Sequence, residues 1–335
     1  MQIFNNWDVI AKGWYIACSS QEIPKKKAKS LELCGQRIVI FRGEDGQVRA
    51  LDAYCPHLGT DLGIGEVKGN FLRCAFHHWT FDESGLCQHI PSQSEIPAQA
   101  RVPAYATEEK YGFIWIYPDA EAPEEVPNFD ELKDKEILTQ TDRSFTRTCH
   151  HHICMMNGID IQHLKTIHHL DIKMELSLNF PGEIGTQIDF TIRGQFPQTT
   201  WRERLGQRFL GATYQYSMRY AYGCIGLLKM MENVQLFPPL YMLYAYTPIA
   251  PAKTRIQPIY ITEKRPGIRG YLLSTLLLLW TRLAYYLLRD EDGKIYDNIQ
   301  FQPKLLLSMD QPLAQYIEYV NQLEPSRWST EAVAM

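Results

Sequence analysis

The sequence lacks the features that mark several large classes of protein. Eight cysteines in 335 residues are too few for a disulfide-stapled scaffold. Lys and Arg (34) do not outnumber Asp and Glu (38), so the net charge of −4 gives no basic excess for nucleic-acid phosphates. The N-terminus shows no basic segment followed by an apolar run, as a secretory leader would. We therefore expect a cytoplasmic protein that binds no nucleic acid, in which cysteines serve more often as metal ligands or redox groups than as disulfides.

Length and composition indicate an ordinary globular chain of two domains, at about 150 residues per domain. Residues 1–117 are rich in short β-branched and aromatic runs between turn-forming residues, which predicts an all-β sandwich or barrel. The acidic, proline-containing stretch 118–136 is the predicted linker, and residues 137–335 predict an α+β domain. The runs behind these predictions are 37–41, 48–54, 70–76 and 112–118 for the first domain, strands near 184–194, 212–222, 241–249 and 255–262 for the second, and helices near 153–169, 268–300 and 311–322.

Residues 271–288 form the longest apolar segment of the chain. Polar residues recur through it and just beyond at helical spacing, which favours an amphipathic helix packed on its own domain. The alternative is that its broad apolar face touches a membrane or a lipophilic substrate, with basic residues just ahead of it. The polar residues are Ser274, Thr275, Thr281, Arg282, Tyr285 and Arg289, and the basic ones Lys264, Arg265 and Arg269.

Histidine has an uneven distribution, because all ten histidines lie between positions 57 and 169. Cys55 and His57 form a C-x-H pair, and Cys74 and His77 form a C-x-x-H pair, with sixteen residues between His57 and Cys74. Two thiolates and two imidazoles suit one tetrahedral zinc ion. They equally suit a [2Fe–2S] cluster with the sulfurs on one iron and the nitrogens on the other.

These residues and their neighbours, CPHLG and CAFHHW, resemble the Rieske motif. Two positions depart from its usual form, since Ala75 stands in place of Pro and His78 in place of Gly. Neither departure removes a ligand, so the resemblance implies that Cys55, His57, Cys74 and His77 bind a [2Fe–2S] cluster. The other six cysteines show no ligand spacing and are expected to act as small buried hydrophobes: Cys18, Cys34, Cys87, Cys149, Cys154 and Cys224.

A second constellation lies in NGIDIQHLKTIHH (157–169). Its D-x-x-H-x-x-x-x-H pattern, Asp160, His163 and His168, resembles the mononuclear-iron motif of the Rieske non-haem iron oxygenases. Asp160 lies one helical turn before His163 and can reach its ring. His163 and His168 are about 140° apart on an ideal helix, so both can face one metal only if the helix widens or ends between them.

The third iron ligand implied by the resemblance is a carboxylate far downstream. RDEDGKIYDNIQ (289–300) fits, with Asp292 as the ligand between Glu291 and Ile295, while Asp290, Asp297 and Asp310 compete. His169 is an alternative to His168 in a shifted register. The remaining histidines are assigned no metal: the run 150–152 is expected to be a solvated or structurally hydrogen-bonded strand, and His89 has no motif support.

The resemblance to this family implies a C-terminal helix-grip, START-like domain with an apolar pocket above the iron. It also implies a homotrimer, in which electrons pass from His77 through Asp160 to His163 of a neighbouring subunit. A ferredoxin or an NAD(P)H-dependent reductase would supply the electrons, and dioxygen would hydroxylate a hydrophobic substrate, polycyclic or isoprenoid-like. The alternatives are a desaturase or demethylase on the same scaffold, or a Rieske electron carrier without oxygenase activity.

Overall fold

The computed structural model describes residues 2–167, 175–179, 185–195, 204, 211, 213–234 and 238–330. The chain divides into two compact units. One comprises residues 12–126 with the C-terminal segment from 325, and the other comprises residues 1–11 with 127–324. The division after residue 126 falls inside the stretch 118–136 that the sequence predicts as a linker.

The unit formed by residues 12–126 contains two antiparallel sheets, and no helix longer than three residues occurs in its described part. The six-stranded sheet has the order β1-β10-β9-β4-β3-β2, and the four-stranded sheet has the order β5-β6-β7-β8. The predicted all-β architecture is confirmed. Its strands are β1 (Tyr15–Ser19), β2 (Lys27–Leu33), β3 (Gln36–Arg42), β4 (Val48–Asp52), β5 (Glu66–Lys68), β6 (Phe71–Arg73), β7 (Thr80–Phe81), β8 (Cys87–His89), β9 (Ala104–Lys110) and β10 (Phe113–Tyr117).

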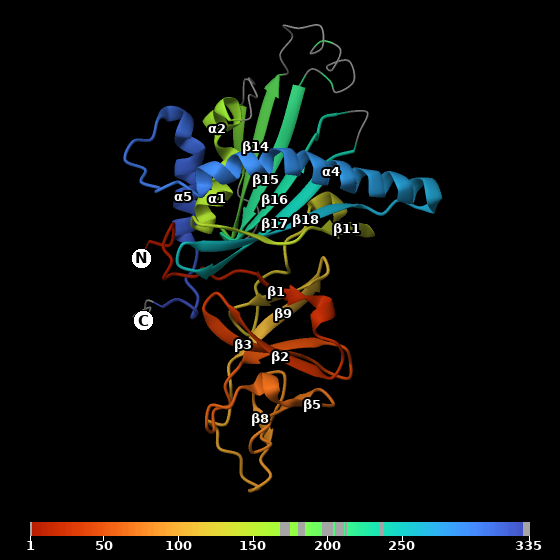
Figure 1. The fold of residues 1–335 in the computed structure, drawn as a ribbon, viewed down its shortest axis with the longest axis vertical. Helices are drawn as coiled ribbons and strands as arrows, with labels where there is room; N and C mark the ends of the chain where they lie inside the picture. Colours follow the sequence, from red (N-terminus) through yellow and green to blue (C-terminus); the bar gives the residue numbers. More distant parts are fainter. Residues whose placement is uncertain are drawn as a thin grey trace. The chain divides into compact units, whose positions relative to one another are not determined.

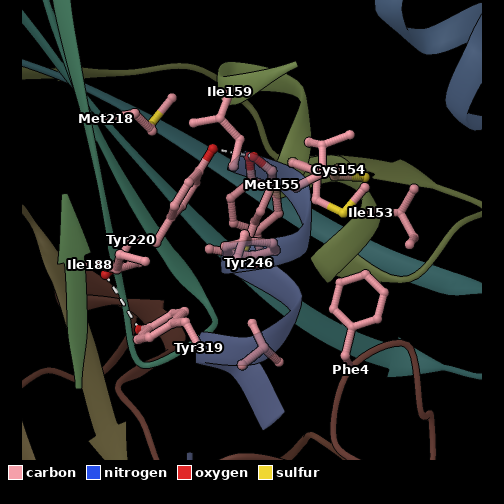
Figure 2. Close-up of a cluster of buried hydrophobic side chains, with 14 of the residues drawn as sticks. Phe4, Ile153, Cys154, Met155, Ile159, Ile188, Met218, Tyr220, Tyr246 and Tyr319 are labelled. Carbon is pink, nitrogen blue, oxygen red and sulfur yellow. Dashed lines mark hydrogen bonds between the residues drawn. The ribbon is translucent and has the colours of Figure 1, made fainter. Parts of the chain in front are cut away.

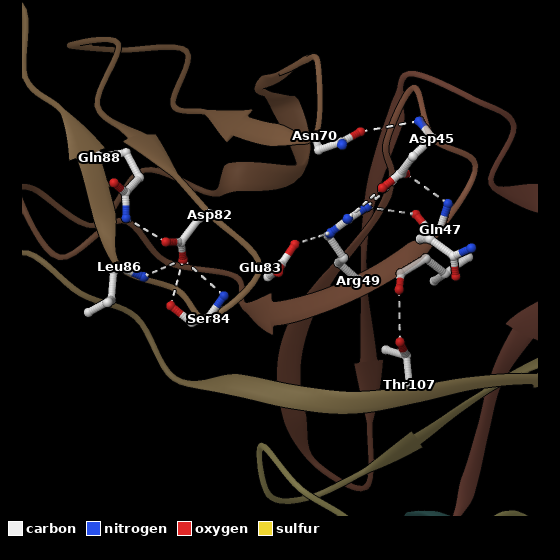
Figure 3. Close-up of polar contacts among 11 residues, drawn as sticks. Asp45, Gln47, Arg49, Asn70, Asp82, Glu83, Ser84, Leu86, Gln88 and Thr107 are labelled. Atoms are coloured by element: carbon white, nitrogen blue, oxygen red, sulfur yellow. Dashed lines mark hydrogen bonds and ion pairs between the residues drawn. The ribbon is translucent and has the colours of Figure 1, made fainter.

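Arg49 ties two turns of this unit together (Figure 3). Its guanidinium donates to Asp45 Oδ2 at 2.7 Å in the first turn and to Glu83 Oε2 at 3.1 Å in the second. Asp82 closes the second turn by accepting from the backbone N–H groups of Ser84 (2.9 Å) and Leu86 (3.0 Å). An Asp side chain that accepts from N–H groups just ahead of it is a standard turn device. These turns fix the ends of the strands that frame the cysteine–histidine loops.

The other unit is built on one antiparallel sheet of the order β11-β18-β17-β16-β15-β14-β13, with β12 also paired to β18. The long helix α4 lies across one face of this sheet (Figure 1). The predicted α+β architecture is confirmed. The elements are β11 (Ile137–Thr141), β12 (Phe145–Arg147), α1 (His151–Met156), α2 (Ile161–Thr166), β13 (Glu175–Asn179), β14 (Gln187–Gln195), β15 (Thr213–Ala221), β16 (Ile225–Met230), β17 (Leu240–Ala250), β18 (Lys253–Glu263), α4 (Gly267–Tyr296) and α5 (Gln311–Gln322).

The main core of this unit packs α1 and α5 against the strands (Figure 2). Tyr220 on β15 is fully buried, and its hydroxyl donates to the backbone carbonyl of Met155 on α1. Tyr319 on α5 donates to the carbonyl of Thr186 at 2.6 Å. Burying a tyrosine is favourable when its hydroxyl keeps a hydrogen-bond partner, and both residues meet that condition. The two tyrosines therefore fix the helices relative to the sheet.

The segment 153–169 does not form the single helix expected from the sequence. Helix α1 stops at Met156, a 3-10 turn follows at Asn157–Ile159, and α2 restarts after Asp160 and ends at Thr166. Asp160 is the N-cap of α2, since its Oδ1 accepts from the backbone N–H of His163 at 3.0 Å. A short polar side chain that caps a new helix is a local signal that helical periodicity does not reveal.

His150–His152 form neither a strand nor a solvated segment, although His150 and His152 do make the structural hydrogen bonds that were the other possibility. His150 is the N-cap of α1, and His151 and His152 form its first turn. All three rings are at least 97% buried. The backbone N–H of His152 donates to His150 Nδ1 at 3.3 Å, a capping role that side-chain alternation could not indicate.

Helix α4 packs on its own domain, as expected, but part of its polar stripe lies on the packed side beside Leu277 and Leu278. Ser274 and Thr281 of the predicted polar stripe are buried against the domain, where Ser274 Oγ donates to the carbonyl of Glu263 at 2.7 Å. Arg282 pairs with Asp142 at 2.7 Å. The side that faces away from the sheet is apolar instead, with large residues 42–82% exposed: Ile268, Tyr271, Leu272, Leu273, Leu276, Leu279, Trp280, Leu283 and Tyr286. Among the described residues, no helix is long and apolar enough to cross a membrane.

Candidate metal centres and cavity

The two predicted cluster loops meet at the edge of the four-stranded sheet. Cys55 and His57 follow β4, while Cys74 and His77 lie between β6 and β7. The two thiols are buried and lie within hydrogen-bonding distance of each other. The imidazoles are exposed, and their Nδ1 atoms lie 3.1 Å apart. The fold thus brings one sulfur and one nitrogen from each loop to the same place.

The donor set fits a [2Fe–2S] cluster with mixed ligands. A Rieske centre takes two thiolates on one iron and two imidazoles on the other. The same separation exists here, with sulfurs on the buried side and nitrogens on the solvent side. Burial raises the pKa of Cys55 to about 11, so its thiol keeps its proton near pH 7 unless a metal binds the sulfur. Cluster binding must therefore displace a proton, as thiolate ligation generally does.

The loop positions next to the ligands require unusual backbone angles. Gly59 has φ +75° and His78 has φ +59°, both in the left-handed region. Glycine occupies that region freely, whereas a residue with a Cβ is strained there. The resemblance noted above has glycine at the position of His78. The structure explains that preference as a requirement for positive φ in the turn that presents His77.

The second predicted centre brings His163 on α2 to Asp292 on α4. His163 Nε2 and Asp292 Oδ1 lie 2.9 Å apart. Two ligand atoms at right angles around one divalent transition metal, each about 2.1 Å from it, are themselves separated by about 3.0 Å. The observed spacing is thus compatible with one shared ion as well as with a direct hydrogen bond. A nitrogen and a carboxylate oxygen are also the donor types of a facial triad.

Asn157 holds the carboxylate in place. Its Nδ2 donates to Asp292 Oδ2 at 2.6 Å, which leaves Oδ1 directed to His163. Asn157 Oδ1 is buried without a hydrogen-bond partner, and an orphaned acceptor at this depth is costly. Sequence reasoning placed Asn157 inside the motif without assigning it this contact. The contact shows that Asn157 orients the carboxylate of Asp292, the proposed ligand.

The spacing of His163 and His168 allows both to face one metal only if the helix widens or ends between them. Helix α2 ends at Thr166, between the two histidines. His168 and the alternative His169 lie outside the described residues. Asp160 contacts the backbone of His163 as a helix cap. Its predicted role as an electron bridge stays a prediction.

Two of the three competing acids have other contacts in the structure. Asp297 binds Arg147 at 3.2 Å and the backbone N–H of Thr148 at 3.1 Å. Asp310 accepts from Gln162 at 2.7 Å and caps the turn at Leu307. The third, Asp290, has no described side chain. Asp292 is thus the acid that the fold places against His163.

An apolar cavity of about 150 Å3 adjoins Asp292. Small-molecule sites are typically concave and lined by apolar groups with a few polar ones, which is the character of this wall. The wall combines aromatic and sulfur-containing side chains from the sheet with polar groups from β12, α4 and the Asn157 turn. The lining includes Phe145, Arg147, Cys154, Met155, Asn157, Gly158, Leu164, Tyr216, Met218, Leu228, Met230, Tyr244, Tyr246, Ile256, Tyr285, Arg289, Asp292 and Tyr296.

His150, His151 and His152 present one ring nitrogen each within 4.8 Å of one another. Hydrogen bonds nevertheless occupy the lone pairs of two of the three rings, those of His150 and His152, whereas His151 Nδ1 has no partner. Asn5 N–H donates to His152 Nδ1 at 3.1 Å, so His152 Nε2 carries the proton in the neutral ring. His150 Nδ1 accepts from His152 N–H, and its Nε2 faces the carbonyl of Asn6 at 3.2 Å. We assign this cluster to structure, and burial lowers the pKa of His150 to about 4.

Comparison with known proteins agrees with both halves of this description. Residues 13–106 match the Rieske [2Fe-2S] domain. The chain is 33% identical over 173 residues to a cholesterol 7-desaturase of Bombyx mori, covering 50% of this chain and 38% of that protein. It is 26% identical over 276 residues to a probable 3-ketosteroid-9-alpha-monooxygenase oxygenase component of Rhodococcus rhodochrous, covering 77% and 66%. The fold is similar to that of dicamba monooxygenase bound to 3,6-dichlorosalicylic acid, with TM-score 0.66, 21% identity, and coverage of 94% and 98%.

The chain thus combines a Rieske [2Fe-2S] domain with an α+β domain in which a histidine and a carboxylate meet beside an apolar cavity. With these relatives and this fold, the chain resembles the Rieske non-haem iron oxygenases. Proteins of this family use a [2Fe–2S] cluster and a mononuclear iron, as predicted from the two motifs. The chain spans well under two thirds of the Bombyx mori relative, so activity and substrate are matters of proposal.

Proposed function

We propose that the chain is the oxygenase component of a Rieske oxygenase that hydroxylates a hydrophobic substrate, polycyclic or isoprenoid-like, with dioxygen. The observation that carries this proposal is the contact between His163 and Asp292, 2.9 Å apart, beside the cavity. A carrier that only relays electrons needs neither this pair nor a cavity. Similarity to a steroid monooxygenase component and to a cholesterol desaturase supports an apolar polycyclic substrate.

Each predicted site residue has a role in this proposal. Cys55, His57, Cys74 and His77 hold the cluster. A ferrous ion held by His163, His168 and Asp292 supplies open coordination positions at which dioxygen is activated. Asp160 positions His163 and is the proposed electron bridge.

The chain's own residues position the substrate and protect the site. Asn157 keeps one carboxylate oxygen of Asp292 turned to His163. The tyrosine-, leucine- and methionine-lined wall excludes water and holds an apolar skeleton near the ligands. Arg147 is anchored by Asp297 at the cavity wall, where it can orient a carbonyl or hydroxyl group of the substrate. Holding the target carbon in a fixed position lowers the entropic part of the barrier.

The proposed partners are a ferredoxin or an NAD(P)H-dependent reductase, and further copies of the chain in a homotrimer. Cytoplasmic location is part of the same proposal. The molecular mass in solution tests the oligomer, because a trimer has three times the chain mass of 38.9 kDa. A monomer at micromolar concentration would contradict it.

The function is tested by reconstitution with a ferredoxin and reductase, followed by product analysis with isotopic dioxygen. We expect turnover of sterols or other isoprenoid compounds and incorporation of one labelled oxygen atom into the product. Asp292→Ala should abolish turnover, whereas Asp310→Asn should retain it because Asp310 contacts Gln162 and the backbone N–H of Leu307 instead. Turnover by Asp292→Ala would refute the assignment of the site.

Desaturation is the second candidate, because the alignment with a cholesterol 7-desaturase has 33% identity over half of this chain. Hydrogen abstraction need not end in oxygen transfer. The same experiment separates the two outcomes, since a desaturated product contains a new double bond and no labelled oxygen.

We also propose that the outer side of α4 lies on a membrane surface. Its apolar residues recur at helical spacing, and Trp280, Tyr271 and Tyr286 are of the kind enriched at lipid–water interfaces. The packed side is formed by other residues, Ser274 and Thr281 beside Leu277 and Leu278, so the outer apolar residues take no part in packing on the sheet. Arg269 near the N-terminal end forms no ion pair within the described part of the chain and suits anionic headgroups.

Sedimentation with anionic vesicles tests this contact. We expect the wild type to bind and the double variant Leu276→Gln/Leu283→Gln to lose most of that binding. Ile64→Gln, at a residue that is 71% exposed in the other unit, is the matched control and should bind normally. Equal binding of all three proteins would contradict the proposal.

A further inference from the structure

Two cysteines outside both metal centres lie in close contact. Cys149 precedes the N-cap of α1, Cys154 lies within that helix, and their Sγ atoms are 3.2 Å apart. Both side chains are more than 90% buried. Sequence spacing assigned them no role, because residues five apart across a helix start do not form a recognised ligand or disulfide motif.

The backbone on both sides of the pair is held in place. Thr254 Oγ1 donates to the carbonyl of Cys149 at 2.9 Å, and the N–H of Ile153 donates to the carbonyl of His150 at 2.9 Å. A disulfide needs an S–S distance of about 2.05 Å, so the sulfurs must approach by about 1 Å. Rotation of the two short side chains can supply this movement without displacing the fixed backbone.

The contact shifts the pKa values of the two thiols in opposite directions. The hydrogen bond from the Cys154 thiol, the largest contribution, lowers the pKa of Cys149, and the same contact together with burial raises that of Cys154. Thiolate character at one sulfur with a thiol beside it is the arrangement from which sulfenic acid and then disulfide form.

The pair is also accessible from the cavity. Cys154 belongs to the cavity wall together with Asn157 and Asp292, whereas Cys149 lies directly behind it. Two-electron reduction of dioxygen without substrate oxidation yields hydrogen peroxide, which is small enough to diffuse within such a cavity. This source of oxidant rests on the proposed oxygenase function.

We propose that Cys149 and Cys154 form a peroxide-sensitive dithiol in the wall of the substrate cavity. The thiolate of the pair attacks one peroxide oxygen, giving a sulfenic acid and releasing hydroxide. The second thiol then attacks the sulfenic sulfur, forming the disulfide, and its proton leaves with the sulfenic hydroxyl as water. The proton that the first thiol lost on becoming a thiolate neutralises the hydroxide. Two thiols and one peroxide thus become one disulfide and two waters, with sulfur oxidised and peroxide oxygen reduced.

Disulfide formation alters the cavity next to the proposed iron ligands. Helix α1 ends at Met156, and the following residue, Asn157, holds Asp292. Rotation of the Cys154 side chain therefore changes the shape of the cavity wall that Cys154 shares with Asn157 and Asp292. The dithiol is placed to reduce turnover when peroxide accumulates and to restore it on reduction.

Alkylation of the full-length holoprotein before and after treatment with hydrogen peroxide tests this inference. Trypsin releases residues 148–165 as one peptide that contains Cys149 and Cys154 and no other cysteine. We expect this peptide to be doubly alkylated in the reduced protein. After peroxide it should be unalkylated and lighter than the free dithiol form by about 2 Da, the mass of the two hydrogens lost, and dithiothreitol should reverse the change.

Two single variants and a control complete the experiment. Cys149→Ser and Cys154→Ser should both abolish the disulfide form, whereas Cys18→Ser, a buried cysteine of the other unit, should leave it unchanged. Double alkylation after peroxide, or conversion only to sulfinic and sulfonic acids, would overturn the proposal. Because peroxide is added directly, this result does not depend on oxygenase turnover, and the isotope experiment above can fail independently.

Discussion

Mild acid should destabilise the unit that contains His150, His151 and His152. Burial lowers the pKa of all three, to about 4 for His150, and no carboxylate contributes to any of these shifts. The unfolded chain binds a proton at each ring near pH 6.5, whereas the folded chain does not. Stability is therefore fully present above pH 6.5 and is lost as the pH falls toward 4.

The size of the effect follows from the same linkage. A histidine with a folded pKa of about 4 loses about 2 kcal/mol of folding free energy between pH 7.5 and pH 5. Three such rings lose up to about 6 kcal/mol, against a typical domain stability of about 5–15 kcal/mol. Few other groups titrate in this range, because carboxylates protonate mainly below it.

Urea unfolding followed by circular dichroism at pH 7.5, 6 and 5 measures this dependence. His151→Leu should reduce the loss by about one third, since it removes one of three titrating rings and His151 Nδ1 has no hydrogen-bond partner to lose. His89→Gln changes an exposed ring in the other unit and should behave as the wild type. A urea midpoint independent of pH, or equal effects of the two substitutions, would refute the reasoning.

Three further substitutions test other parts of the structure. His78→Gly should raise the stability of the Rieske unit by about 1 kcal/mol, measured by thermal unfolding, because it relieves a positive φ; a loss of stability would contradict this. Asp142→Ala should lower the free energy of unfolding by about 1–3 kcal/mol in urea titrations, since Tyr260 and Arg282 both lose a partner; an unchanged midpoint would contradict that contact. Gly158→Ala should raise KM for a bulky substrate more than for a small one, because the new Cβ would lie 2.4 Å from Met218 Cε in the cavity wall; equal effects on both substrates would count against the cavity as the substrate site.

Much of the fold and the family was predictable, because the signals were local. The C-x-H and C-x-x-H loops and the D-x-x-H motif carry chemistry at fixed short spacings. Alternating apolar runs likewise predicted β15, β17 and β18 to within one or two residues at each end. The choice of Asp292 rested on resemblance, and the contact with His163 is a tertiary feature that no spacing could reveal.

The predictions that failed concerned polar side chains that were expected to face solvent but are buried and hydrogen-bonded. His150–His152 look like a polar run, yet they cap and start a buried helix. Ser274 and Thr281 look like a solvent-facing stripe, yet backbone carbonyls of Glu263 and Leu277 accept their hydroxyls inside the domain. Periodicity identifies the two sides of a helix. It does not decide which side faces the sheet when buried hydroxyl groups can donate to backbone carbonyls.

The central claim is that one chain carries two separate iron centres, a relay cluster and an oxygen-consuming site. Iron and acid-labile sulfide per chain, measured on anaerobically purified protein, test it directly. We predict three irons and two sulfides for the wild type and two of each for Asp292→Ala, since a [2Fe–2S] cluster contributes two irons and the mononuclear site one. Two irons in the fully loaded wild type, with no further loss in Asp292→Ala, would contradict the account.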